Sequence, residues 1–120
     1  SDIENSIGMA IDGFVYLLRK DGTVVKYSRG QKQDFSLKNI PAPYNKVTNP
    51  IIIKTEESSD KIYILDKPDY YRLLSFTKNG DYTKQIIIEN ISGEIVSMAV
   101  DEGNKKIYLG GSSGVIQINI

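Results

Sequence analysis

The stretch MAVDEGNKKIYLGG, residues 98–111, reads as an apolar run, a polar turn and a second apolar run. Residues 9–18, MAIDGFVYLL, follow the same plan with a shorter turn, and residues 51–66, IIIKTEESSDKIYILD, follow it again. One tyrosine recurs in the second run of each copy, at intervals of 47 and 45 residues: Tyr16, Tyr63 and Tyr108. Self-similarity at such a period predicts a chain built from repeated structural units.

Each copy continues into further strand-like runs. The third runs are TVVKYS (23–28), RLLSF (72–76) and GVIQINI (114–120), and the first two units reach a fourth run at 33–40 and 82–90. Asp12-Gly13 and Asn79-Gly80 are strong hairpin signals, because glycine tolerates the positive φ that tight hairpin turns need. No window shows apolar residues at helical spacing. The pattern therefore predicts antiparallel, four-stranded meanders.

The second strand of each unit is apolar on both faces, as in FVYLL (14–18) and IYIL (62–65). Such a strand must be covered on both faces, whereas a sandwich strand alternates more cleanly. Four strands in each period of about 40–50 residues are typical of β-propellers. The predicted fold class is therefore all-β, with about three propeller blades that form half of a six-bladed ring. The alternative is an irregular β-sandwich.

The whole chain, residues 1–120, is expected to be a single domain. Blade one covers about 7–40, blade two about 47–91, and blade three about 95–120, where the outer strand is lacking.

Residues 64–86, ILDKPDYYRLLSFTKNGDYTKQI, resemble a repeat of the NHL-type propeller family. Asp66 and Arg72 match the family's Asp and Arg, an apolar run follows, and Gly80 matches the turn glycine. Asp69 replaces the usual Asn, and the Asp-to-Arg spacing is one residue longer. The resemblance implies that Asp66 and Arg72 tie a turn to a strand. Repeats of this rhythm also occur in larger, often membrane-attached bacterial proteins, which hints at an extracytoplasmic or membrane-attached parent.

Three blades leave two apolar flanks open, and a head-to-tail homodimer would close them into a six-bladed ring. IEN at 3–5 repeats IEN at 88–90, the end of blade two's fourth strand. We therefore expect residues 2–6 of one chain to lie beside 114–120 of another. The predicted assembly edge consists of Ile3, Ile116, Ile118 and Ile120. The alternative partner is the missing half of a longer parent propeller.

The composition argues against most chemistry. Fifteen basic residues balance fifteen acidic ones, and the chain has no His and no Cys. Without the commonest general base and metal ligands, we expect no catalytic residue, no metal and no cofactor. DEGNKK (101–106) and TEESSD (55–60) carry acidic residues but lack calcium-loop spacing, so both are interpreted as turns. No apolar run is long enough to cross a membrane.

The remaining candidates are contact surfaces. Tyr70, Tyr71 and Arg72 are residue types that dominate protein interfaces, so they are the candidates for contact with a protein ligand. The alternative, which the sequence favours, is structural: one tyrosine packs on the adjacent blade, and Arg72 pairs with Asp66 or Asp69. Nucleic-acid binding around Lys26 and Arg29 is disfavoured, because acidic residues dilute the basic patch. The sequence favours a noncatalytic propeller scaffold or binding module. The alternative is a fragment of a larger propeller enzyme or receptor whose functional residues lie in absent blades.

Overall fold

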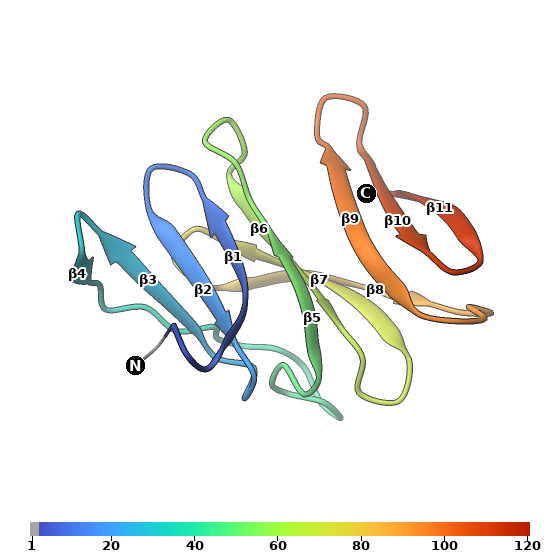
Figure 1. Ribbon diagram of the computed structural model, residues 1–120, viewed down its shortest axis with the longest axis horizontal. Coiled ribbons are helices and arrows are strands. Elements are labelled where there is room, and N and C mark those ends of the chain that lie inside the picture. Colours follow the sequence, from blue (N-terminus) through green and yellow to red (C-terminus); the bar gives the residue numbers. More distant parts are fainter. Residues whose placement is uncertain (1–2) are drawn as a thin grey trace.

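The computed structural model of the protein describes residues 3–120 (Figure 1). These residues form eleven β-strands, and no helix occurs among them. The strands are β1 (Ser6–Ile11), β2 (Val15–Arg19), β3 (Val24–Ser28), β4 (Gln31–Lys32), β5 (Pro50–Lys54), β6 (Lys61–Asp66), β7 (Tyr71–Thr77), β8 (Tyr82–Ile88), β9 (Ile95–Asp101), β10 (Lys106–Gly111) and β11 (Gly114–Asn119).

The strands form three sheets, each a meander in chain order. Sheet one has the order β1-β2-β3-β4, sheet two β5-β6-β7-β8, and sheet three β9-β10-β11. All pairings within these sheets are antiparallel. The all-β fold class and its blade-like meanders of four, four and three strands are thus confirmed.

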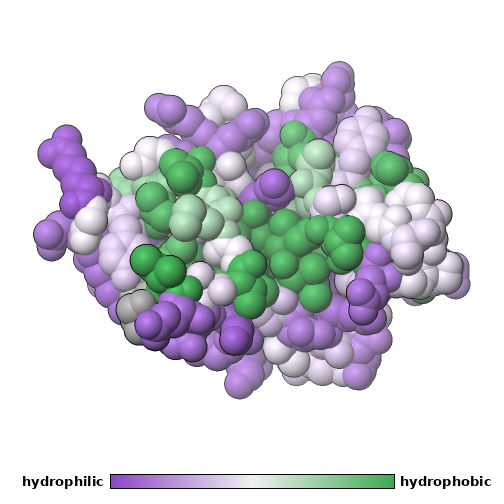
Figure 2. Space-filling model, viewed as in Figure 1, coloured by the Kyte–Doolittle hydropathy of each residue, from purple (hydrophilic) through white to green (hydrophobic). Residues whose placement is uncertain are grey.

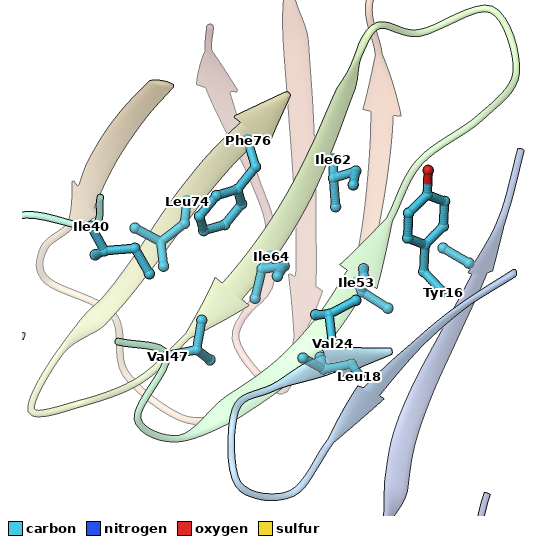
Figure 3. Close-up of a cluster of buried hydrophobic side chains, with 11 residues drawn as sticks. Tyr16, Leu18, Val24, Ile40, Val47, Ile53, Ile62, Ile64, Leu74 and Phe76 are labelled. Atoms are coloured by element: carbon cyan, nitrogen blue, oxygen red, sulfur yellow. The ribbon is translucent and has the colours of Figure 1, made fainter. Parts of the chain in front are cut away.

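The three sheets stack face to face, with β1, β5 and β9 side by side (Figure 1). A first apolar cluster lies between sheets one and two (Figure 3). Its buried members are Ala10, Tyr16, Leu18, Val24, Ile40, Val47, Ile53, Ile62, Ile64, Leu74 and Phe76. A second cluster lies between sheets two and three, with Tyr63, Leu65, Tyr71, Leu73, Ile88, Ile95, Met98, Ile107 and Leu109. Each fully buried Leu or Ile side chain stabilises the fold by about 1.5–3 kcal/mol.

Sheet two is therefore covered on both faces. Ile64 points into the first cluster and Leu65 into the second, and both are fully buried. Since successive side chains of a strand point to opposite faces, this arrangement explains the unbroken apolar sequence of β6.

The predicted fourth strand of the first unit, at 33–40, is wrong. Strand β4 contains only two residues, and the chain then leaves sheet one. Lys38 forms an isolated parallel bridge with Asp81 of sheet two, and Ile40 is buried in the first cluster. The physical reason is burial: Phe35 and Leu37 also pack against this cluster, which an outer strand continuing beside β3 would not reach.

Candidate functional site

The most deeply buried polar group is the Asp66–Arg72 ion pair of sheet two. Asp66 ends β6 and Arg72 lies directly opposite it in β7, so the two side chains share one face. The Arg72 guanidinium donates two hydrogen bonds to Asp66 Oδ2, from Nε at 3.0 Å and from Nη2 at 2.8 Å. Both side chains are at most 1% exposed.

This ion pair holds the connection between sheets one and two. Asp66 accepts hydrogen bonds from the backbone N–H groups of Thr48 and Asn49, and Arg72 donates to the carbonyl oxygens of Tyr44 and Lys46. These hydrogen bonds satisfy buried polar groups that would otherwise have no partner. The pair ties a turn to a strand, the role that the sequence resemblance implies.

The three residues predicted to contact a protein ligand are placed differently from one another. Arg72 is inside the fold and is unable to reach a partner. Tyr71 is 5% exposed, packs in the second cluster, and its hydroxyl oxygen accepts a hydrogen bond from the Ile95 N–H of sheet three at 2.9 Å. For these two residues the neighbouring sheet and the connection cover the side chains, as the structural alternative expects, and the ligand-contact prediction is corrected.

Only Tyr70 of this trio keeps exposed surface. Its ring meets Tyr44 edge-on, with 5.9 Å between centroids, and the Tyr44 hydroxyl donates to Asp69. That hydrogen bond raises the pKa of Tyr44. Tyr70, Tyr44 and Asp69 form a small polar-aromatic surface that the sequence did not reveal, since Tyr44 is 26 residues away from Tyr70.

The recurring tyrosines mark the face of each sheet that a following sheet covers. Tyr16 is fully buried against sheet two, and Tyr63, 5% exposed, faces sheet three. Tyr63 donates its hydroxyl to Glu102 Oε1 at 2.8 Å, in the turn after β9. Burial and this hydrogen bond raise the pKa of Tyr63. Tyr108 is only half-buried, because no sheet follows in the described chain.

Asp12 and Lys78 connect the ends of sheets one and two. Lys78 donates to Asp12 Oδ2, and the Tyr16 hydroxyl donates to the same oxygen at 3.2 Å. Burial by itself raises the pKa of Asp12, but the hydrogen bonds from Lys78 and the Phe14 N–H outweigh it, so the pKa lies below its ordinary value. Burial and the Asp12 charge raise the pKa of Tyr16.

The outward face of sheet one is apolar. Its register places Met9, Ile11 and Val15 on the face turned away from the first cluster, and Met9 and Ile11 are 57% and 60% exposed. In the view of Figure 2, apolar side chains also gather across the middle of the molecule, over β1 and β5, the neighbouring first strands of sheets one and two. The opposite end of the stack, the outward face of sheet three, carries Tyr108 and the 74% exposed Val115.

The predicted assembly edge is only partly arranged as a strand edge. Residue 2 lies outside the described residues, residues 3–5 form a turn, and Ser6 already belongs to β1 opposite Arg19. The Ser6 N–H donates to the Ile3 carbonyl oxygen, which closes that turn. Residues 3–5 are therefore a turn rather than the expected extended segment, although Ile3 is 71% exposed.

Strand β11 is the outer strand of sheet three. Ile116, Ile118 and Ile120 pack against the second cluster rather than facing a partner. Their side chains support the core, while the backbone edge of β11 pairs with no other described strand.

The remaining charged motifs make contacts within the protein. Lys26 donates to the Lys78 carbonyl oxygen and its Nζ lies 4.3 Å from the centroid of the Phe14 ring, so it faces the protein. The Asp101 carboxylate accepts two hydrogen bonds from Asn104 within its hairpin turn. In the turn at 55–60, the Ser59 hydroxyl donates to Glu102 Oε1 at 2.5 Å and is buried, a long-range contact that nothing in the sequence indicates.

Residues 3–120 contain no cluster of three or more acidic side chains placed to hold a metal ion. Over the same residues there is no helix long and apolar enough to cross a membrane. The chain matches no known family model, and a search of curated proteins finds no match either.

Proposed function

We propose that the chain is a noncatalytic β-propeller-type module that acts by assembly, in which two copies join head to tail and six sheets close into one ring. The observation that supports this proposal most strongly is which faces of the three sheets are packed against another sheet. Sheet two is packed on both faces, whereas sheets one and three are each packed on one.

The outward face of sheet one supports an assembly role. Ile11, Val15 and Tyr27 lie in register across three strands, and Met9 extends the same apolar surface. Soluble proteins rarely leave a contiguous apolar patch uncovered unless it is an interaction site. A second sheet is the cover that this face fits, since the opposite face of sheet one is covered in that way.

The outward face of sheet three indicates that a sheet of a second copy would follow it in the same order as the sheets within one chain. Tyr108 lies in register with Ala99 and Gln117, at the position that Tyr16 and Tyr63 hold in the earlier sheets. Both of those tyrosines are covered by the sheet that follows along the chain. In the proposed ring, the sheet that follows Tyr108 is sheet one of a second copy.

A two-fold ring contains two identical contacts between sheet three of one copy and sheet one of the other. The buried Asp66–Arg72 pair is consistent with the resemblance to NHL-type repeats, and membership of that family stays a prediction. The competing proposal is that the remaining blades of a longer propeller, such as an enzyme or receptor, cover the same two faces.

The mass of the purified chain in solution tests the proposal. Sedimentation equilibrium or light scattering should give twice the mass of one chain at micromolar concentration. Met9→Lys places a charge on the proposed contact and should weaken dimerisation at least tenfold. Ile87→Lys, at a 48% exposed position on β8 away from that contact, is the matched control and should change it less than twofold.

A wild-type chain that stays monomeric at 100 μM overturns ring closure by self-association and favours the longer propeller. Equal weakening of dimerisation by Met9→Lys and Ile87→Lys also contradicts the proposal, because it would show that the dimer does not depend specifically on the outward face of sheet one.

A further inference from the structure

A groove of about 660 Å³ lies at the end of sheet two where β7 begins and β8 ends. One wall is the turn between β6 and β7, residues 67–70, and the other is the connection from β8 to β9, residues 89–94 (Figure 1). Each wall joins two strands of the structure, so both ends of each wall are fixed. The volume lies within the range of ordinary ligand pockets, about 300–1,000 Å³.

The turn between β6 and β7 is held by the connection between sheets one and two. The Lys67 N–H donates to the Asn49 carbonyl oxygen at 3.0 Å, and Asp69 accepts a hydrogen bond from the Tyr44 hydroxyl. The rings of Tyr44 and Tyr70 also pack edge-on. This wall is therefore formed before a ligand arrives, which lowers the entropy cost of binding.

The connection from β8 to β9 is held by the turn between β10 and β11. The Ser113 hydroxyl donates to the Ser92 carbonyl oxygen, and the Ser112 N–H donates to the Glu94 carbonyl oxygen at 3.2 Å. A Cβ at Gly93 would lie 2.1 Å from Ser112 Oγ, so the two segments approach each other closely. The groove thus lies between two segments that distant parts of the chain keep in place.

The groove is lined by polar side chains that have unused hydrogen-bonding capacity. Lys67 Nζ lies 4.7 Å from the centroid of the Tyr71 ring and forms no ion pair with another described residue. One carboxylate oxygen of Asp69 accepts the hydrogen bond from Tyr44, and the other makes none within residues 3–120. Glu89 and Asn90 are exposed, and their side chains make no hydrogen bond with another described residue. Donors and acceptors are therefore both available to a ligand.

The groove also has an apolar lining. Tyr71 and Ile88 lie opposite each other as the last pair of the β7–β8 ladder, and both belong to the second cluster. Ile91 packs against the same cluster, and the ring of Tyr70 is half-buried. A ligand that fits this lining needs an apolar face as well as polar groups.

The charges in the groove favour a neutral ligand. A simple anion would meet the carboxylates of Asp69 and Glu89, and a simple cation would meet the ammonium group of Lys67. A purely apolar molecule would remove these polar groups from water without giving them partners. A neutral molecule with many hydroxyl groups avoids both costs, because each hydroxyl group donates and accepts hydrogen bonds.

We propose that this groove binds a neutral carbohydrate. Its hydroxyl groups bond to Asp69, Glu89 and Asn90, and the C–H groups on one face of a sugar ring stack on the ring of Tyr70. The face of an aromatic ring carries partial negative charge, which attracts polarised C–H groups. The groove is separate from the outward faces of sheets one and three, so this inference is independent of ring closure.

Titration of the isotopically labelled full chain with neutral sugars, followed by the NMR shifts of backbone amides, tests the proposal. The probes are the methyl glycosides of glucose, galactose, mannose and N-acetylglucosamine, together with cellobiose, maltose and lactose. At least one should give saturable shift changes that are largest at residues 67–71 and 87–93, with a Kd of about 10 mM or lower. The affinity should change less than twofold between about 50 and 500 mM NaCl, because binding of a neutral sugar forms no ion pair.

Substitutions locate the site. Tyr70→Ala should weaken binding of that sugar at least tenfold, whereas Tyr70→Phe, which keeps the ring, should weaken it less than threefold. Tyr108→Ala removes another half-buried tyrosine, outside the groove, and as the matched control should change binding less than twofold. Glu89→Ala alters only an exposed side chain and should weaken binding at least threefold.

No saturable shift with any of the seven sugars at about 100 mM overturns the proposal, as do shift changes that are largest outside residues 67–71 and 87–93. Equal effects of Tyr70→Ala and Tyr108→Ala, or unchanged binding by Glu89→Ala, also contradict it. If methyl glucuronide or methyl glucosaminide binds more tightly than methyl glucoside and loses its affinity in 500 mM NaCl, the groove selects an ion, and the proposal of a neutral carbohydrate is wrong.

Discussion

At the scale of single residues, buried charge is matched by specific partners. Arg72 is one of the largest fully buried side chains, and it is tolerated because Asp66, Gln85 and two carbonyl oxygens accept its hydrogen bonds. Breaking such a pair from one side costs about 3–5 kcal/mol, because the remaining charge stays buried without a partner. This residue is therefore a determinant of the fold rather than of binding.

Asp12 should make stability depend on acid pH. The pKa of Asp12 in the folded protein lies below its ordinary value. The contribution of Asp12 to the free energy of unfolding is therefore fully present above the unfolded-state pKa, and it is lost as the pH falls through the folded-state pKa. We expect Asp12→Asn to lower the free energy of unfolding by about 1–2 kcal/mol at pH 6, since it removes a charge-assisted hydrogen bond with partly exposed Lys78.

Urea titrations of the wild type and of Asp12→Asn at pH 6, 4 and 2.5 give the measurement. The difference between the two proteins should shrink as the pH falls below 4, because the wild-type carboxylate becomes protonated. A difference that stays constant down to pH 2.5 would contradict the assignment.

At the scale of elements, turns decide where the chain passes from one sheet to the next. Gly80 connects β7 to β8 with φ +92°, a conformation that side chains of L-residues rarely adopt. The segment at 33–40 crosses this turn, where the Lys38 N–H donates to the Gly80 carbonyl oxygen. The turn glycine thus serves both its own hairpin and the connection from sheet one.

Gly80→Ala should therefore lower the free energy of unfolding more than a Gly→Ala substitution at an open turn does. A Cβ at position 80 would lie 2.0 Å from the Ser36 carbonyl oxygen, whereas a Cβ at Gly13, φ +102°, meets no atom within 4 Å. Gly13→Ala should destabilise the fold by about 1–2 kcal/mol from backbone strain, and Gly80→Ala by at least 1 kcal/mol more.

Thermal and urea unfolding of both variants measure these costs. Limited proteolysis should also cut the segment at 33–40 faster in Gly80→Ala than in the control. Equal stability of the two variants would show that the close approach of Ser36 is not maintained in solution.

At the scale of the whole molecule, stability is concentrated in the middle of the stack. Sheet two has apolar clusters on both faces, and its inner strands β6 and β7 are buried at almost every position. Strands β4 and β11, in contrast, are mostly exposed and lie at sheet edges. Local opening is therefore expected to begin in sheets one and three.

Hydrogen exchange followed by NMR should reveal this gradient. Backbone amides of β6 and β7 that donate within sheet two should exchange at least about tenfold more slowly than those of β11. The measurement belongs at a concentration where the oligomeric state is known, because assembly would protect the end sheets. Uniform protection across all three sheets of a monomer would contradict the expected order.

The sequence by itself determined the repeat period, the hairpins and the meander order, because these depend on nearby residues. Turn pairs such as Asp12-Gly13 act over a few positions, and a strand that is apolar on both faces indicates burial before its neighbours are known. The Asp66–Arg72 spacing likewise indicated a structural pair. The structure contains each of these features, because local conformational preference and tertiary packing favour the same arrangement.

Only the tertiary structure decided which side chains those sheets cover. The residue types of Tyr71 and Arg72 fit an interface as well as a core, and only the packing shows that sheet three and the connection from sheet one bury both side chains. The segment at 33–40 alternates like a strand, yet it leaves sheet one and packs Phe35, Leu37 and Ile40 into the apolar cluster between the sheets. Burial depends on residues that are distant along the chain, and a local sequence pattern does not show which residues these are.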